Sequence, residues 1–198
     1  AADERFTLTG DGSAIQLNEI GGGGADALDG GTVNDTIAGG DGADTIDGND
    51  GLDNMSGGAG NDTFTLNAKT EYVTAYGTDI IDGGAGTDTV TFTGAQNLSA
   101  ANLATISNTE VWTIPTGSDF TLSDTVLANN PGLTFNFAGN GTLSTGEDTA
   151  GKSLMSTAIN LTATTAGNLK IVGSSADDTF SFDATEVLNN DDTIDGNA

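Results

Sequence analysis

The chain lacks both histidine and cysteine, has only two prolines, and carries four basic residues among its 198 residues. Without cysteine and histidine the chain cannot form a disulfide, a thiolate or imidazole metal site, a His-based triad or a cysteine nucleophile. The G-x-S-x-G nucleophile elbow is also absent from the sequence. Acidic pairs of the kind that glycosidases use are abundant, but the repeat described below accounts for their positions. We therefore expect no enzyme activity from this chain.

Basic side chains are too few to balance the acidic ones. Arg5, Lys69, Lys152 and Lys170 stand against 29 acidic residues, which leaves a formal net charge of −25. Because such a charge opposes compaction, we expect cations to complete the fold. No basic patch exists to hold a phosphate backbone, so nucleic acid is excluded as a partner.

Long apolar runs are missing as well. No stretch of about 18 apolar residues predicts a membrane span, and the opening AADERFTLTG resembles no signal peptide. The last residues, DDTIDGNA, stop inside what looks like a further repeat. We expect the chain to be a segment of a longer protein.

Glycine is abundant, with 30 copies, and much of it lies in a strict repeat. Residues 21–65 divide without gaps into GGGGADALD, GGTVNDTIA, GGDGADTID, GNDGLDNMS and GGAGNDTFT. The sixth position is always aspartate: Asp26, Asp35, Asp44, Asp53 and Asp62. The eighth is always apolar: Leu28, Ile37, Ile46, Met55 and Phe64. A flexible glycine-rich linker would carry no apolar period, so the pattern predicts an ordered fold.

This pattern resembles the G-G-x-G-x-D-x-U-x repeat of the repeats-in-toxin (RTX) proteins, a calcium-binding β-helix repeat. The resemblance implies an all-β fold, a right-handed parallel β-solenoid in which two repeats complete one turn. Physically, the six glycine-rich residues suit a tight turn, and the last three suit a short strand whose middle side chain points inward. Turns two repeats apart would stack at about 4.8 Å.

The resemblance also implies where calcium binds. Asp26, Asp44 and Asp62 would line one edge of the roll, and Asp35 and Asp53 the other. Ca²⁺ prefers oxygen ligands and can lie between stacked turns, where glycines leave main-chain carbonyls accessible. The candidate sites are therefore Asp26 with Asp44, Asp44 with Asp62, and Asp35 with Asp53.

Two repeats depart from the pattern, at Val33 in place of the fourth glycine and at Asn49 in place of the second. Asparagine tolerates a left-handed φ, whereas valine does not readily do so. The turn at 30–35 therefore fits the pattern of a calcium-binding turn least well, and we expect Asp35 to matter less than Asp44. The acids outside the sixth position, Asp29, Asp41, Asp47 and Asp50, are interpreted as solvated or charge-tuning residues.

The array continues after an eight-residue insert, LNAKTEYV, at 66–73. TAYGTDIID at 74–82 matches half of the pattern, and GGAGTDTVT at 83–91 matches all of it. If the insert bulges out, Asp79 pairs with Asp53 and Asp88 with Asp62. The predicted calcium ligands are therefore Asp26, Asp35, Asp44, Asp53, Asp62, Asp79 and Asp88.

The remainder of the chain predicts further solenoid coils without metal. Short alternating runs predict strands at 89–93, 110–114, 119–123, 133–137, 158–162 and 168–172. Residues 97–105 and 123–130 suit short helical turns capped by serine or aspartate, and residues 173–181 look like a degenerate repeat. The predicted segments are a leading coil or cap at 1–20, the calcium roll at 21–91, metal-free coils at 92–172, and a degenerate repeat with the start of a new array at 173–198.

The whole arrangement is similar to bacterial surface-layer proteins and RTX adhesins. It implies an extracellular, cell-surface structural module that is exported unfolded by type I secretion and folds on calcium. Other copies, the rest of a longer chain and surface polysaccharide are the expected partners. A module that binds glycan or ice, or the non-catalytic tail of a secreted enzyme, are the alternatives. The outward seventh and ninth repeat positions form an irregular threonine ladder, and Trp112 is interpreted as core rather than as a sugar-stacking residue.

Overall fold

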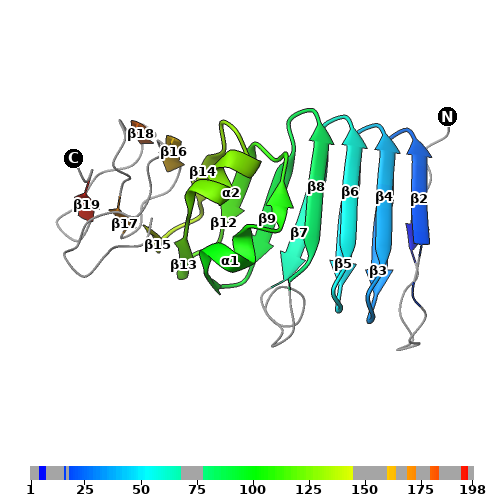
Figure 1. Cartoon of the computed structure of the whole chain (residues 1–198), viewed down its shortest axis with the longest axis horizontal. Helices are drawn as coiled ribbons and strands as arrows, with labels where there is room; N and C mark the ends of the chain where they lie inside the picture. The colour runs from blue at the N-terminus through cyan, green and yellow to red at the C-terminus, as the bar shows by residue number, and fades with distance from the viewer. Residues whose placement is uncertain are drawn as a thin grey trace.

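The computed structural model describes residues 5–7, 16, 18–67, 78–144, 160–163, 169–172, 179–182 and 193–195. Outside 18–67 and 78–144, the description is confined mainly to the backbone of short strands. The described strands stack side by side into an elongated parallel solenoid (Figure 1). Their order confirms the predicted all-β solenoid, because each strand pairs in parallel with the strand one turn further along the chain.

One sheet, called here the long sheet, extends through the whole described stack. Its nine strands are β1 (Arg5–Thr7), β3 (Ala27–Gly31), β5 (Thr45–Asn49), β7 (Thr63–Asn67), β9 (Thr89–Thr93), β12 (Val111–Ile114), β14 (Thr134–Phe137), β16 (Asn160–Ala163) and β18 (Thr179–Phe182).

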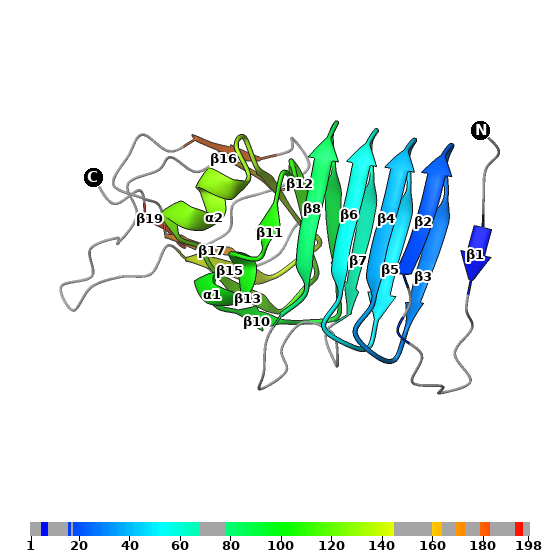
Figure 2. The ribbon, with the colours of Figure 1, turned by 45° about the vertical axis from the view of Figure 1, so that its right-hand side comes forward.

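Two shorter sheets share the other side of the solenoid. The roll sheet contains β2 (Asn18–Gly23), β4 (Thr36–Asp41), β6 (Asn54–Ala59), β8 (Ile80–Ala85) and β11 (Ile106–Ser107). The coil sheet contains β10 (Asn97–Leu98), β13 (Ser118–Thr121), β15 (Gly141–Ser144), β17 (Leu169–Val172) and β19 (Thr193–Asp195). Two short helices, α1 (Ala100–Leu103) and α2 (Asp124–Asn129), lie where one sheet gives way to the other (Figure 2).

Alternation along each strand builds the core. Leu28, Ile46 and Phe64 are stacked neighbours on the long sheet and are at most 2% exposed. Their outward neighbours remain partly accessible, as expected for a strand with one face in the core. Each such side chain contributes about 1.5–3 kcal/mol of burial free energy. The apolar eighth position therefore holds the solenoid together.

The roll continues across the insert. Residues 68–77 lie outside the described part of the chain, but β7 pairs with β9 and β6 with β8 in the same register as the earlier strands. The sequence separation between stacked neighbours rises from 18 residues to 26, which equals one turn plus the eight inserted residues. The stacking that was conditional on a bulging insert is therefore present.

Both predicted helical turns are confirmed. Ser99 caps α1 in a capping box with Asn102, and Ser123 caps α2 by accepting from the Val126 N–H. The carboxyl end of α2 covers the last strand of the roll sheet, where Asn130 Nδ2 donates to the Ile106 carbonyl at 2.9 Å. Because a covered edge cannot pair with another strand, the roll sheet ends at β11.

The six strands predicted from residue 89 to residue 172 all match within two residues at each end, but three short strands were not predicted. Residues 141–144 were expected to be part of a loop and form β15. The two-residue strands β10 and β11 were not predicted, because so short a run shows no alternation. In all these places the pairing partner on the neighbouring coil decides the strand, not the local pattern.

Trp112 is a core residue, as predicted. It is fully buried, its ring contacts Phe92 and Phe135 edge to face, and its indole N–H donates to Thr109 Oγ1 at 2.8 Å. Thr109 in turn donates to Asn130 Oδ1.

Among the described residues, no helix has the length and apolar character needed to cross a membrane.

Candidate metal centre

The sixth-position aspartates form two ladders along the edges of the roll. In the first ladder, the Asp26 N–H donates to Asp44 Oδ1, the Asp44 N–H to Asp62 Oδ1, and the Asp62 N–H to Asp88 Oδ1, each at 2.8 Å. The carboxylates of Asp44, Asp62 and Asp88 therefore each bridge two stacked turns.

The second ladder has the same contacts on the other edge. The Asp35 N–H donates to Asp53 Oδ1 at 2.7 Å, and the Asp53 N–H donates to Asp79 Oδ1 at 2.8 Å. All seven ladder aspartates are buried. The structure thus brings together the pairs named from the sequence, including Asp53 with Asp79 and Asp62 with Asp88. Their service as calcium ligands remains a prediction.

The other carboxylate oxygen differs sharply in its surroundings. Oδ2 of Asp44, Asp62 and Asp88 is buried and has no hydrogen-bond partner. Residues 18–67 and 78–144 contain no lysine, arginine or histidine, so no basic side chain of these segments can neutralise the ladders. A buried, unpaired carboxylate is strongly unfavourable, which means that these oxygens suit a cation.

Main-chain oxygens converge on the same places. A β-carbon on Gly39 would collide with Asp44 Oδ2 and lie 2.6 Å from the Gly57 carbonyl oxygen of the next turn. A β-carbon on Gly57 would likewise meet Asp62 Oδ2 and lie 2.5 Å from the Gly83 carbonyl oxygen. Only glycine leaves this space open between turns. Each gap thus offers carboxylate and carbonyl oxygens from two successive turns.

The chemistry of the donors fits calcium. Every candidate ligand is oxygen, and Ca²⁺ takes about six to eight oxygen ligands in a flexible geometry. No three acidic side chains of the described segments gather at one point. Main-chain carbonyls therefore have to supply much of the coordination shell, which explains why the turns are rich in glycine.

Burial also shifts the proton affinity of the ladder. Desolvation raises the pKa of Asp44, Asp62 and Asp88 above the ordinary 3.8, and the backbone hydrogen bond to each carboxylate opposes the rise. Neighbouring carboxylates raise the pKa further: Asp44 and Asp88 act on Asp62, and Glu110 and Asp82 act on Asp88. The ladders are therefore regions of concentrated negative charge.

Asp35 stands apart from the other ladder residues. Its Oδ2 accepts from the Gly31 N–H of its own turn at 2.8 Å. The backbone of Val33 in that turn does not have a positive φ, whereas Gly42, at the same repeat position, has a φ of +136°. Asn49, the other departure, does adopt a left-handed φ of +62°, as expected for asparagine. The Gly31 N–H thus engages the Oδ2 atom of Asp35, whereas Oδ2 of Asp44, Asp62 and Asp88 has no hydrogen-bond partner.

Two acids outside the ladders are engaged with a turn instead. Asp47 Oδ1 accepts from the Asn49 N–H at 3.1 Å, and Asn49 Nδ2 donates to Asp29 Oδ1. Burial raises the pKa of Asp47, with the backbone hydrogen bond opposing and the Asp29 charge adding to the rise. These contacts hold the turn at Asn49, and the solvated or charge-tuning role of the two acids stays a prediction.

Sequence reasoning missed Glu110. Its Oε2 accepts from the Asp88 N–H at 2.7 Å, in the position that an aspartate takes elsewhere in the ladder. The available signal was the run Thr109-Glu110-Val111-Trp112, in which an acid is followed after one residue by a buried apolar residue, as in the repeats.

Comparison with protein families agrees with this geometry. The family model described as RTX calcium-binding nonapeptide repeat (4 copies) matches residues 20–37, 29–64 and 74–92. This part of the chain is an RTX β-roll. The RTX match covers about a third of the chain and makes Ca²⁺ the cofactor of the roll. Neither the curated proteins nor the solved structures gave a significant match to the chain.

Acid should have opposite effects with and without calcium. A carboxylate whose folded pKa is raised adds stability below its ordinary pKa, and this stability is lost as pH rises through the folded pKa. In chelator, lowering the pH from about 7 to about 4 should therefore increase the β-sheet signal in circular dichroism. In millimolar calcium the same change should weaken it, because protons compete with the metal. A fall in signal on acidification in chelator would contradict the prediction.

Asp44 should matter more than Asp35 for calcium binding. Asp44→Asn keeps Oδ1 as an acceptor for the Asp26 N–H but replaces the unpartnered Oδ2 with an uncharged NH₂ group. We therefore expect a clear rise in the calcium concentration at the midpoint of folding. Asp35→Asn is the matched control, and its midpoint should rise less because the Gly31 N–H already engages this carboxylate. Equal midpoints in parallel calcium titrations would argue against this ranking.

Proposed function

We propose that this chain is an extracellular structural module that folds when calcium binds and contributes to a surface layer, an adhesin stalk or a filament. The observation that carries the proposal is the pair of aspartate ladders, buried in segments without a basic residue. Stacked ionised carboxylates repel one another, and desolvation adds to the penalty. A divalent cation in each gap offsets both effects, so metal binding and folding become one equilibrium.

The affinity class of such sites supports an extracellular location. Extracellular calcium modules bind at about 10⁻⁴ to 10⁻³ M, far above free cytosolic calcium. A chain of this kind stays unfolded inside the cell and folds after export. RTX repeat proteins are typically secreted, which agrees with type I export and a place on the bacterial cell surface. The absence of cysteine fits a chain that needs no oxidising compartment.

The continuity of the core supports a structural role. Phe64, Val90, Trp112 and Phe135 are successive inward neighbours on the long sheet, so the interior passes from roll to coils without a break. Because each turn of a solenoid contacts only its neighbours, an uninterrupted core couples the stability of the roll to that of the adjoining coils. Exposed acids such as Asp41 provide surfaces that calcium can bridge between copies.

Calcium should switch the isolated chain from coil to β structure. Circular dichroism in chelator should show a largely unfolded chain, and millimolar calcium should restore the β spectrum, with a midpoint well above about 1 µM. Sedimentation of the loaded protein should show association that grows with concentration. An unchanged spectrum on chelation would overturn coupled folding, while a monomer at every concentration would overturn assembly alone.

A second candidate function, binding to a glycan or to ice, is favoured by the outer face of the long sheet. Thr65, Thr91 and Thr113 occupy the same outward position on three successive strands, and Thr63 and Thr89 form a second row beside them. The threonine ladder is thus more regular beyond residue 62 than in the first repeats. Parallel strands about 4.8 Å apart repeat these hydroxyl and methyl groups at a constant spacing.

This face can be tested separately from calcium binding. Thr91→Tyr breaks the row with a bulky ring, and Thr36→Tyr places the same ring on the exposed face of the roll sheet as a control. If the long sheet binds a regular surface, Thr91→Tyr should abolish partition into growing ice or onto insoluble polysaccharide, and Thr36→Tyr should not. Binding that is absent in the unaltered chain, or equal in both variants, would rule out this face.

A further inference from the structure

The first ladder does not end at the last nonapeptide repeat. The Asp88 N–H donates to Glu110 Oε2 at 2.7 Å, which repeats the contact of the Asp62 N–H with Asp88 Oδ1 at 2.8 Å. The pairing of Val111 with Thr89 places Glu110 directly above Asp88 in the stack. Glu110 therefore forms one more rung, on a turn that has no glycine repeat.

The oxygens around this rung match those of the gaps below it. Asp88 is fully buried, and its Oδ2 has no hydrogen-bond partner. A β-carbon on Gly83 would lie 2.8 Å from this oxygen and would collide with the carbonyl oxygen of Asn108. In the turn below, Gly57 stands in the same relation to Asp62 Oδ2 and to the Gly83 carbonyl.

Asn108 replaces a glycine of the roll at this turn. Its φ of +52° is left-handed, a conformation that asparagine tolerates better than most residues. Its side chain is held by Asp82, whose Oδ1 accepts from Asn108 Nδ2 at 2.7 Å. The backbone can thus present a carbonyl oxygen to Asp88 although the nonapeptide has ended.

The opposite edge shows what the end of a ladder looks like. β8 pairs Ile81 with Ile106, so the residue above Asp79 is Ala104, which has no carboxylate and caps α1. On the first edge, β12 pairs Val111 with Thr134, so the residue above Glu110 is the buried Leu133. Glu110 is therefore the last acidic rung in the described part of the first ladder.

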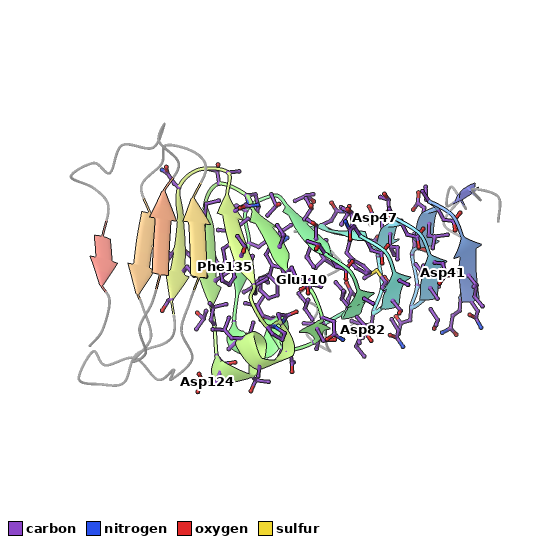
Figure 3. All side chains as sticks on the ribbon, turned by 90° about the horizontal axis from the view of Figure 1, so that it is seen from above. Asp41, Asp47, Asp82, Glu110, Asp124 and Phe135 are labelled. Atoms are coloured by element: carbon purple, nitrogen blue, oxygen red, sulfur yellow. The ribbon has the colours of Figure 1, made fainter. Side chains whose placement is uncertain are left out.

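We propose that Asp88, in the last nonapeptide repeat, forms a terminal calcium site with Glu110 and the Asn108 carbonyl oxygen, both of which lie outside the repeats. This inference depends on the proposed function, that the ladder gaps bind calcium. The site lies where the roll meets the coils that follow it (Figure 3). A cation held there joins the last repeat to the strand that carries Trp112, and so links folding of the coils to calcium.

Counting bound ions tests the site. Glu110→Gln keeps an oxygen acceptor for the Asp88 N–H but removes the charge, and Asp119→Asn removes one charge from an exposed position on the coil sheet as the control. Native mass spectrometry at saturating calcium should show one ion fewer in Glu110→Gln than in the unaltered chain and Asp119→Asn. An equal ion count in all three would overturn the inference.

Terbium, a hard cation that replaces calcium, provides a local readout. Trp112 is the sole tryptophan, and its indole N–H donates to Thr109, the residue between Asn108 and Glu110. Terbium emission excited through tryptophan should be strong in the unaltered chain and in Asp119→Asn, and weak in Glu110→Gln. Undiminished emission in Glu110→Gln would contradict the site.

Two outcomes separate this inference from the proposed function. An unaltered chain that neither binds calcium nor folds with it would overturn both. A chain that folds on calcium while Glu110→Gln binds the full number of ions overturns only the terminal site. If Glu110→Gln does not fold, Glu110→Asp decides, because a raised midpoint with an unchanged ion count supports the site and an unchanged midpoint contradicts it.

Discussion

The roll depends on the burial of one carboxylate per turn along each edge. In five of the seven ladder aspartates one carboxylate oxygen accepts the main-chain N–H of the preceding rung, as in Asp44 with Asp26, which fixes the register between turns. The other oxygen of Asp44, Asp62 and Asp88 is buried without a hydrogen-bond partner. A cation is the natural complement of such an arrangement, and the glycines that leave space for it are constrained by the same geometry. The positions of the aspartates, the positions of the glycines and the place for a cation therefore all follow from the same gap between turns.

In the coils that follow the roll, the main-chain N–H and C=O groups at the corners are hydrogen-bonded by serine and asparagine side chains and not by aspartate ladders. Ser99 and Ser123 cap two short helices, and Asn130 bonds the Ile106 and Val126 carbonyls with its amide. Such side-chain contacts take the place of the aspartate contacts of the roll, because buried main-chain groups must find partners. The inward face of the long sheet needs no such change. Its apolar row continues through Trp112 and Phe135, so two kinds of corner share one core.

Much of the roll could be predicted because its pattern is local. The period of nine identified which side chains enter the core and which line the edges, and the structure places Asp44 between Asp26 and Asp62 accordingly. Sequence reasoning failed where a contact depends on a neighbouring coil. β15 was missed because residues 141–144 become a strand through pairing with β13. Glu110 was missed because it follows Asp88 by 22 residues, with no repeat to set the spacing.

The sequence by itself showed that residues 20–64 and 74–92 carry RTX calcium-binding repeats. It also determined which positions of the roll face inward and which line its edges, because strand alternation and turn chemistry are properties of a few adjacent residues. Only the tertiary structure decided how coils of unequal length stack. It showed that eight extra residues leave Asp79 and Asp88 in their ladders, and that one edge ends at Asp79 while the other gains Glu110. The physical reason is that main-chain hydrogen bonds between neighbouring coils determine the stacking. These bonds form whether the loop that connects two paired strands is short or long.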